Sequence, residues 1–266
     1  MPGTLPDSAP ALLLVAHGSR DPRHAATVTA LTTRVRRLLP GVRVAAGYLD
    51  FDAPSVHGAL ERLCAAGARE VVAVPLLLTR AFHAKTDIPG VLAEATSALP
   101  DLTVRQAHVL GPHPLLTAAL QRRLRGAGLA PGDAPSTGVV LAAAGSSDPE
   151  ASAVIADIAR EWRRTTGWCA VRPAFASAAP PRTADAVRAL RAAGARRVAV
   201  APYVLAPGRL PDRIAAGAHE AGADVLAPVL GPAPEVARVV LERYTAAAYA
   251  FPAGGWMRDP ARRAAA

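Results

Sequence analysis

The stretch Leu12-Leu13-Leu14-Val15-Ala16-His17-Gly18-Ser19-Arg20-Asp21-Pro22 decides the fold. It opens with an uncharged apolar run, which predicts a short buried strand that ends at His17. Gly18 and Ser19 then turn the chain, and Asp21-Pro22 is typical of an N-cap followed by the first residue of a helix. A polar residue at the carboxyl end of a parallel strand lies where open α/β sheets bind their ligands. His17 is therefore the first candidate site residue, and the alternative is a histidine that is only hydrogen-bonded into its loop.

Apolar runs alternate with helical periodicities along the chain that follows. Further strands are predicted at 42–49, 71–78 and 103–110, and each is followed by apolar residues at helical spacing. Pro-Gly, Ala-Gly and Gly-Pro pairs separate these segments. Strands that alternate with helices favour a parallel sheet with right-handed crossovers and helices on both faces.

A second copy of this pattern follows at an offset of 127 residues. Gly18-Ser19 and Asp21-Pro22 recur as Gly145-Ser146 and Asp148-Pro149. Such an internal duplication predicts an α/β protein of two similar doubly wound domains that face each other across a cleft, each with a mainly parallel four-stranded sheet flanked by helices. The expected division of the chain is a disordered leader at 1–10, an N-terminal catalytic domain at 11–125, a linker at 126–137, a degenerate C-terminal domain at 138–249 and a flexible tail at 250–266.

Composition excludes several classes of function. The net charge of +9 comes almost entirely from arginine, aromatic residues make up 4% of the chain, and the only cysteines are Cys64 and Cys169. We therefore expect neither a disulfide scaffold nor a thiolate metal site, and no nucleic-acid partner. No apolar stretch approaches the roughly 18 residues that span a bilayer, and no signal peptide is recognisable, so we expect a cytoplasmic protein without a membrane partner. The positive charge favours an acidic partner such as a small polycarboxylate.

The duplication separates residues kept for structure from residues kept for chemistry. The polar residues that follow the first three predicted strands differ between the copies: His17, Asp50 and His83 are replaced by Ala144, Ser177 and Leu210. Because the neighbouring glycines, prolines and core residues persist, we infer that the second copy kept the fold and lost the chemistry. In a parallel sheet the three residues would converge on one crevice. Two imidazoles and a carboxylate can hold Fe²⁺ or Co²⁺ and can accept protons, and the alternative is three unrelated polar residues.

The other histidines are interpreted as structural or solvent-exposed. His24, His57 and His219 fall at helical positions that we interpret as surface. His108 and His113 flank Gly111-Pro112 and are expected to shape that turn.

Three motifs occur in order along the first half of the chain: Leu14-Val15-Ala16-His17-Gly18-Ser19-Arg20, then Tyr48-Leu49-Asp50 with Pro54-Ser55, and then Pro75-Leu76-Leu77-Leu78 with His83 and Asp87-Ile88-Pro89. Together they resemble the sirohydrochlorin chelatase family. The resemblance covers nearly the whole chain, including the degenerate second half. It implies a class II chelatase, which inserts Fe²⁺, or Co²⁺ in cobalamin-making relatives, into sirohydrochlorin without ATP. The lack of a G-x-x-x-x-G-K loop agrees with this.

The resemblance also implies residue roles. His17 and His83 correspond to the family's metal-handling histidines and Asp50 to its acidic partner, so these three are the candidate catalytic residues. Many relatives carry Glu at the place of Asp50, and the shorter carboxylate can act through water. The carboxylates of the macrocycle give a use to nearby polar side chains. The candidate substrate-binding residues are Ser19, Arg20, Arg80, Lys85, Arg209 and Arg213.

The metal is then a substrate, and no permanently bound cofactor is expected. Fe²⁺ and siroheme are favoured because the chain lacks the histidine-rich tract or cysteine cluster that some cobalt-inserting relatives carry, and Co²⁺ insertion is the alternative. A monomer is expected, since a duplicated chain can form in one molecule the cleft that half-length relatives make by dimerising.

Two other functions compete with this interpretation. Val15-Ala16-His17-Gly18 faintly resembles the arginine-histidine-glycine signature of histidine phosphatases, but Ala16 stands where their phosphate-binding arginine belongs. A non-catalytic metal or tetrapyrrole carrier could use the same histidines.

Overall fold

The computed structural model describes residues 9–79 and 87–249, and its contacts divide the chain into two compact units. Unit 1 comprises Met1–Leu110 together with Ala237–Ala266, and unit 2 comprises Gly111–Val236. No helix in the described part of the chain is long and apolar enough to cross a membrane.

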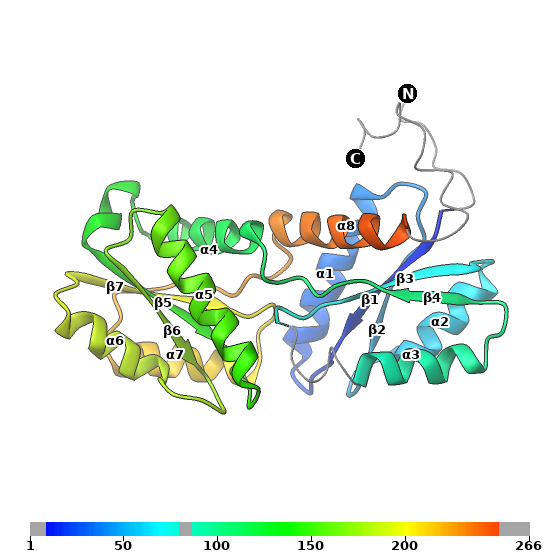
Figure 1. Ribbon diagram of the computed structural model, residues 1–266, viewed down its shortest axis with the longest axis horizontal. Coiled ribbons are helices and arrows are strands. Elements are labelled where there is room, and N and C mark those ends of the chain that lie inside the picture. The colour runs from blue at the N-terminus through cyan, green and yellow to red at the C-terminus, as the bar shows by residue number, and fades with distance from the viewer. Residues whose placement is uncertain (1–8, 80–86, 250–266) are drawn as a thin grey trace, which may run out of the picture. The chain divides into compact units, whose positions relative to one another are not determined.

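Unit 1 is built on a parallel four-stranded sheet in the order β2-β1-β3-β4 (Figure 1). Its strands are β1 (Ala11–Ala16), β2 (Val44–Tyr48), β3 (Glu70–Pro75) and β4 (Thr103–Gln106), and its helices are α1 (Pro22–Leu38), α2 (Val56–Ala65), α3 (Ile88–Ser97) and most of α8 (Pro234–Ala248). Every residue of β1 is buried, as its uninterrupted apolar sequence predicts. The α2 and α3 helices pack on the sheet face that carries Leu13 and Val15.

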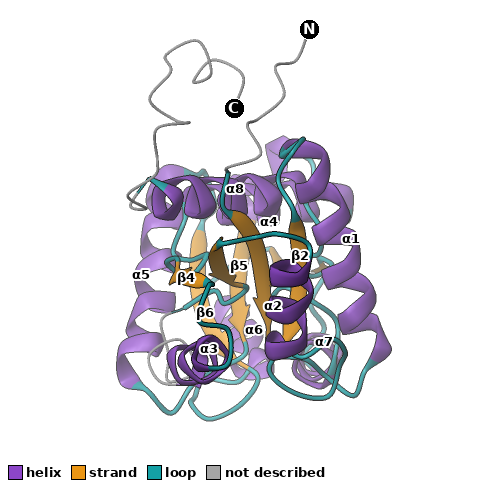
Figure 2. Cartoon of the chain, turned by 90° about the vertical axis from the view of Figure 1, so that its right-hand side faces the viewer, coloured by secondary structure: helices purple, strands orange, loops and turns teal. Residues whose placement is uncertain are grey.

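Unit 2 repeats this architecture in the order β6-β5-β7-β8, with its strands between layers of helices (Figure 1, Figure 2). Its strands are β5 (Thr137–Ala143), β6 (Ala170–Phe175), β7 (Arg197–Tyr203) and β8 (Val225–Leu226), and its helices are α4 (Pro114–Gly126), α5 (Pro149–Thr165), α6 (Thr183–Ala192) and α7 (Arg209–Glu220). All strand pairs in both sheets are parallel. The predicted fold class, with a four-stranded parallel sheet in each half, is confirmed.

The duplication is visible in the backbone as well as in the sequence. The α1 and α5 helices start and end at positions offset by 127, and so do α2 and α6. The turn glycines Gly18 and Gly145 have φ of 93° and 92°. These agreements confirm that the two halves share one fold down to individual turns.

The two units exchange their last helices, which the sequence does not reveal. The α4 helix, expected to close the N-terminal domain, packs against β7 and belongs to unit 2. From Ala237 onward α8 belongs to unit 1, where Tyr244 Oη donates to the Pro10 carbonyl at 2.6 Å and Arg243 donates to the Val109 carbonyl at 2.8 Å. The contacts therefore divide the chain at 110/111 and at 236/237. The expected linker at 126–137 contains a short 3-10 helix, Pro131–Ser136.

Candidate functional site

The candidate site lies at the carboxyl end of β1, the strand between β2 and β3. His17 directly follows β1 and is exposed, and Asp50 follows β2 and is also exposed. The Leu49 N–H donates to the Ala16 carbonyl at 3.0 Å, and the Asp50 N–H donates to the His17 carbonyl at 2.9 Å. Backbone hydrogen bonds thus place His17 and Asp50 side by side at the sheet edge where such folds bind ligands.

Gly18 makes this close approach of the two loops possible. Its φ of 93° lies in the region that disfavours side chains, and a Cβ built on it would lie 1.8 Å from the Asp50 carbonyl oxygen. Any other residue would therefore push the loop after β1 away from the loop after β2. His17 Nδ1 lies 3.4 Å from the Gly18 carbonyl oxygen, which is long for a hydrogen bond.

The loop after β2 is shaped by its own polar groups. Asp50 Oδ1 accepts the Phe51 N–H at 2.8 Å, and the Asp52 N–H donates to the Asp50 carbonyl at 2.7 Å. Phe51 adopts a φ of 61°, which is uncommon for a residue with a bulky side chain. In unit 2 the residue at the place of Asp50 is Ser177, whose hydroxyl donates to the Ala144 carbonyl at 2.8 Å. The turn therefore survives in unit 2 without its carboxylate.

A second layer of polar side chains lies behind this edge. Asp52 Oδ2 accepts the Ser19 N–H at 3.0 Å and lies 3.8 Å from His24 Nδ1, which has no hydrogen-bond partner among the described residues. The His24 ring is tilted against the Tyr48 ring, with centroids 6.4 Å apart. Burial lowers the pKa of His24, the charge of His17 lowers it further, and Asp52 opposes both effects. His17 and His24 therefore influence each other electrostatically.

Our interpretation of His24 as a surface residue was wrong. Its side chain is only 17% exposed, because the first turn of α1 lies over the loop that carries Asp52. The sequence reasoning also passed over Asp52 and Tyr48. The duplication contained the signal that could have found them: His24, Tyr48 and Asp52 are replaced by Ala151, Phe175 and Ala179.

The interpretation of two other histidines as solvent-exposed is confirmed, and a third has the expected turn role. The His57 side chain is 43% exposed, and its Nε2 lies 3.1 Å from Glu61 Oε1, one helical turn away. His219 is exposed near the end of α7. His113 caps α4, because its Nδ1 accepts the Leu115 N–H at 3.2 Å.

The candidate substrate-binding residues fall into three groups. Ser19 and Arg20 lie in the loop after β1, and the Arg20 guanidinium lies 5.2 Å from the centroid of the Phe51 ring. Arg209 and Arg213 are exposed on α7 of unit 2. The remaining candidates, Arg80 and Lys85, lie outside the described residues, and so does His83.

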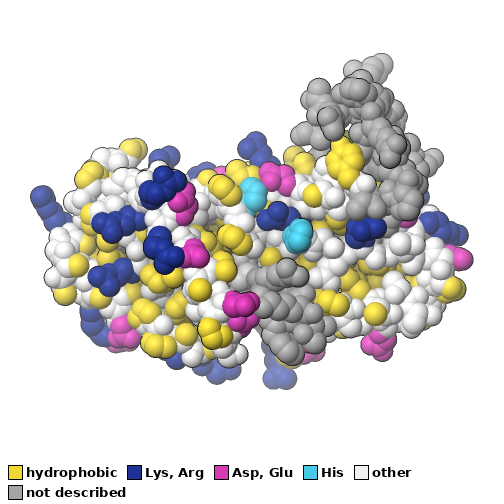
Figure 3. Space-filling view, viewed as in Figure 1, with side chains coloured by type: hydrophobic (Ala, Val, Ile, Leu, Met, Phe, Trp, Pro, Cys, Tyr) yellow, Lys and Arg dark blue, Asp and Glu magenta, His cyan; other side chains and the backbone are white. Residues whose placement is uncertain are grey.

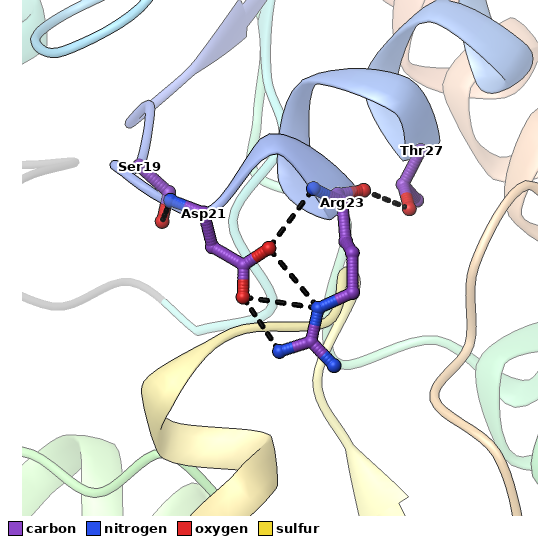
Figure 4. Close-up of polar contacts among 4 residues, drawn as sticks. All are labelled: Ser19, Asp21, Arg23 and Thr27. Atoms are coloured by element: carbon purple, nitrogen blue, oxygen red, sulfur yellow. Dashed lines mark hydrogen bonds and ion pairs between the residues drawn. The ribbon is translucent and has the colours of Figure 1, made fainter.

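Many of the other arginines are engaged by nearby carboxylates. Arg23 folds back on the helix cap, where its guanidinium contacts Asp21 at 2.6 Å (Figure 4). On α5, Arg164 contacts Glu161 at 2.7 Å. Figure 3 shows basic side chains scattered among acidic and apolar ones, without one continuous basic field on that face.

Within residues 9–79 and 87–249, no three His, Cys, Asp or Glu side chains form a group that could hold a metal ion. Among those residues, His17 and Asp50 are exposed, and their backbones are hydrogen-bonded to each other at this sheet edge. An exposed imidazole can take up a metal ion, release it and accept protons, and an exposed carboxylate can also accept a proton.

Comparison with known proteins shows where this arrangement recurs. The sequence model of the family described as CbiX matches residues 11–127 and again 138–247. A sirohydrochlorin cobaltochelatase of Priestia megaterium is 29% identical over 76% of this chain, and the match covers 66% of that protein, just under two thirds. A sirohydrochlorin ferrochelatase of Bacillus subtilis is 26% identical, with 77% of each chain covered.

Solved structures extend the comparison to three dimensions. SirB from Bacillus subtilis with Fe³⁺ superposes with a TM-score of 0.80 at 25% identity, over 90% of this chain and 96% of that one. The sirohydrochlorin chelatase SirB from Bacillus subtilis subspecies spizizenii in complex with cobalt gives a TM-score of 0.77 at 25% identity, over 93% and 98%. Both metals thus occur among similar proteins.

Proposed function

The chain belongs to the CbiX family, and on this basis we propose that it is a sirohydrochlorin chelatase that inserts a divalent metal into the macrocycle without ATP. The observation that carries the proposal is the pairing of His17 and Asp50 at the carboxyl end of β1, joined by backbone hydrogen bonds. Unit 2 keeps the same turns but has Ala144 and Ser177 at these places, so the fold alone does not require the polar pair.

The proposed reaction uses imidazole and carboxylate chemistry. His17, together with His83, passes Fe²⁺ to the pyrrole nitrogens of sirohydrochlorin, and the two N–H protons that the metal displaces must leave. The imidazoles accept these protons, and Asp50 stabilises the imidazolium of His17. Ser19, Arg20, Arg80, Lys85, Arg209 and Arg213 are proposed to bind the peripheral carboxylates. Charge and atoms balance, since one divalent ion enters and two protons depart.

Iron is the proposed metal, and cobalt is the second candidate. The sequence favours iron because it lacks a histidine-rich tract and a cysteine cluster. The relatives support both metals, since a cobaltochelatase and a ferrochelatase match at 29% and 26% identity. Imidazole and carboxylate ligands bind both ions, so the rates with Fe²⁺ and Co²⁺ must be compared directly under anaerobic conditions.

The decisive experiment follows metal insertion by the visible spectrum of sirohydrochlorin. Wild type is compared with His17→Ala, His83→Ala and the control His57→Ala, whose exposed imidazole pairs with Glu61 on α2. We expect each site variant to lose about 10²-fold or more in rate, as removal of a general base does, and the control to keep the wild-type rate. Full rates with both metals in both site variants would show that the site is wrongly assigned.

A carrier gives a different result in the same assay. It would bind the metal or the macrocycle and leave the insertion rate at that of the protein-free control.

We also propose that the chain acts as a monomer, which light scattering coupled to size-exclusion chromatography tests at the assay concentration.

A further inference from the structure

Phe51 is an exposed aromatic side chain on an unfavourable backbone. It is 53% exposed, and the other exposed large hydrophobic residues among those described, Leu38 and Tyr249, lie elsewhere. Its φ of 61° costs free energy for a residue with a bulky side chain, and a ring that is half exposed offsets little of this cost by burial. An exposed aromatic side chain on such a backbone suggests a role in binding, because it contributes little to the core.

The backbone conformation does not need an aromatic residue. Ala178, the corresponding residue of unit 2, has a φ of 62°. The turn is therefore a property of the fold, and it forms equally well with a methyl group. What unit 1 adds is the ring itself, together with Arg20, whose counterpart in unit 2 is Ser147.

Phe51 also has a defined place relative to the candidate site. It follows Asp50, and the Asp50 N–H is bonded to the His17 carbonyl. The guanidinium of Arg20, from the loop after β1, lies 5.2 Å from the centre of its ring. An aromatic face and a cation are thus held together at the rim of the site.

We propose that Phe51 and Arg20 form a docking platform for the tetrapyrrole, with the ring against the macrocycle and the guanidinium on a peripheral carboxylate. The platform rests on the proposed function and adds Phe51 to it, as a residue that works with Arg20 to orient the macrocycle over His17. Offset stacking of aromatic systems and charge-assisted hydrogen bonds to carboxylates are the interactions that this pair offers. It is a positioning device, because neither side chain takes part in proton or metal transfer.

Binding of sirohydrochlorin without metal tests the platform directly. Phe51→Ala should raise the Kd, measured by fluorescence or absorbance titration, about three- to tenfold, the range expected for loss of one aromatic pair. Phe51→Trp should restore tight binding. Arg20→Gln should weaken binding and make it less sensitive to salt, because one ion pair is removed. In turnover, Phe51→Ala should raise KM for sirohydrochlorin and leave KM for the metal unchanged.

Matched controls separate this effect from a loss of folding. Leu38→Ala truncates another exposed hydrophobic residue of unit 1, 43% exposed at the end of α1, and should leave both constants at the wild-type values. Phe51→Ala should unfold at the wild-type urea concentration, since Ala178 already occupies the same turn. A wild-type Kd in Phe51→Ala, or an equal loss in Leu38→Ala, would overturn the platform.

The two proposals can fail separately. If wild type binds the macrocycle but inserts no metal, the chelatase function falls, and the Kd of Phe51→Ala still decides the platform. If wild type inserts metal and Phe51→Ala matches it in Kd and KM, the platform alone is wrong. If wild type does not bind sirohydrochlorin, both proposals are overturned.

Discussion

Gly18→Ala is the sharpest test of how the backbone builds the candidate site. The new Cβ would lie 1.8 Å from the Asp50 carbonyl oxygen, whereas such contacts essentially never fall under 3.0 Å. The loops after β1 and β2 must therefore separate by more than an ångström. That movement breaks the hydrogen bond from the Asp50 N–H to the His17 carbonyl.

The cost of this substitution has two parts that controls can separate. A left-handed backbone costs a non-glycine residue roughly 1–2 kcal/mol, and Gly67→Ala measures this part alone, because Gly67 has a φ of 88° and no atom near its Cβ position. Loss of the hydrogen bond between the two loops adds about 0.5–1.5 kcal/mol. We expect Gly18→Ala to lower the free energy of unfolding by about 1.5–3.5 kcal/mol, and Gly67→Ala by about 1–2 kcal/mol.

The rate of metal insertion distinguishes damage to the candidate site from a loss of stability alone. A displacement of about 1 Å between catalytic groups can cost about 10²-fold in rate, so Gly18→Ala should insert metal about 10²-fold more slowly than wild type. Gly145→Ala places a Cβ 2.0 Å from the Ser177 carbonyl and should destabilise unit 2 to a similar extent. Because the candidate catalytic residues do not lie in unit 2, the folded Gly145→Ala variant should keep most of its activity.

The assays are urea unfolding followed by circular dichroism and metal insertion at saturating sirohydrochlorin. Equal unfolding free energies for Gly18→Ala and Gly67→Ala would refute the argument from the carbonyl contact. A wild-type rate in the folded Gly18→Ala variant would refute the claim that the spacing of His17 and Asp50 matters.

Two further predictions concern stability. Tyr244→Phe removes the buried hydroxyl that donates to the Pro10 carbonyl at 2.6 Å. It should lower the free energy of unfolding, measured with urea, by about 1–3 kcal/mol. An unchanged unfolding midpoint would show that this bond does not hold α8 on unit 1. Burial lowers the pKa of His24, so the unfolded chain takes up the proton first as the pH falls, and the folded state should lose stability below about pH 6.5. His24→Gln should show a shallower loss of unfolding free energy over the same acid range, and a slope equal to that of wild type would contradict the assignment.

Much of the fold follows from local sequence. The N-cap at Asp21 was predicted from its place before Pro22, and the Asp21 side chain does accept the Arg23 N–H at 2.9 Å. The strand ending at His17 was predicted from an apolar run, and all of β1 is buried. These features depend on neighbours in the sequence, so periodicity and capping are enough to find them.

The exchange of α4 and α8 could not be found in the same way. Both helices follow a Leu-Gly-Pro turn, at Leu110 and at Leu230, and each has an apolar face that either sheet could cover. Periodicity shows that a helix needs a partner but does not show which sheet supplies it. The choice is made by long-range contacts, such as the bond from Tyr244 to Pro10.

The candidate site was predicted only in part, because some of its contacts also depend on packing between segments that are distant in the sequence. His17 and Asp50 were found because each ends a strand, and chain topology brings strand ends together. Asp52 and His24 were not predicted to be neighbours, because Asp52 lies in a loop and His24 lies in the first turn of α1. Their proximity depends on how that helix lies over the loop.

Comparing the two units shows which features of the site belong to the fold and which belong to the chemistry. The left-handed glycine, the φ near 60° after β2 or β6, and the bond joining the two loops occur in both units. None of these can therefore be evidence of catalysis, although each is needed to place catalytic groups. The side chains that differ are the informative ones: His17, Arg20, His24, Tyr48, Asp50, Phe51 and Asp52 stand against Ala144, Ser147, Ala151, Phe175, Ser177, Ala178 and Ala179. Because mostly small or apolar residues replace this whole set on a closely matching backbone, we expect the set to act as one functional unit, which the His17→Ala and Phe51→Ala variants test.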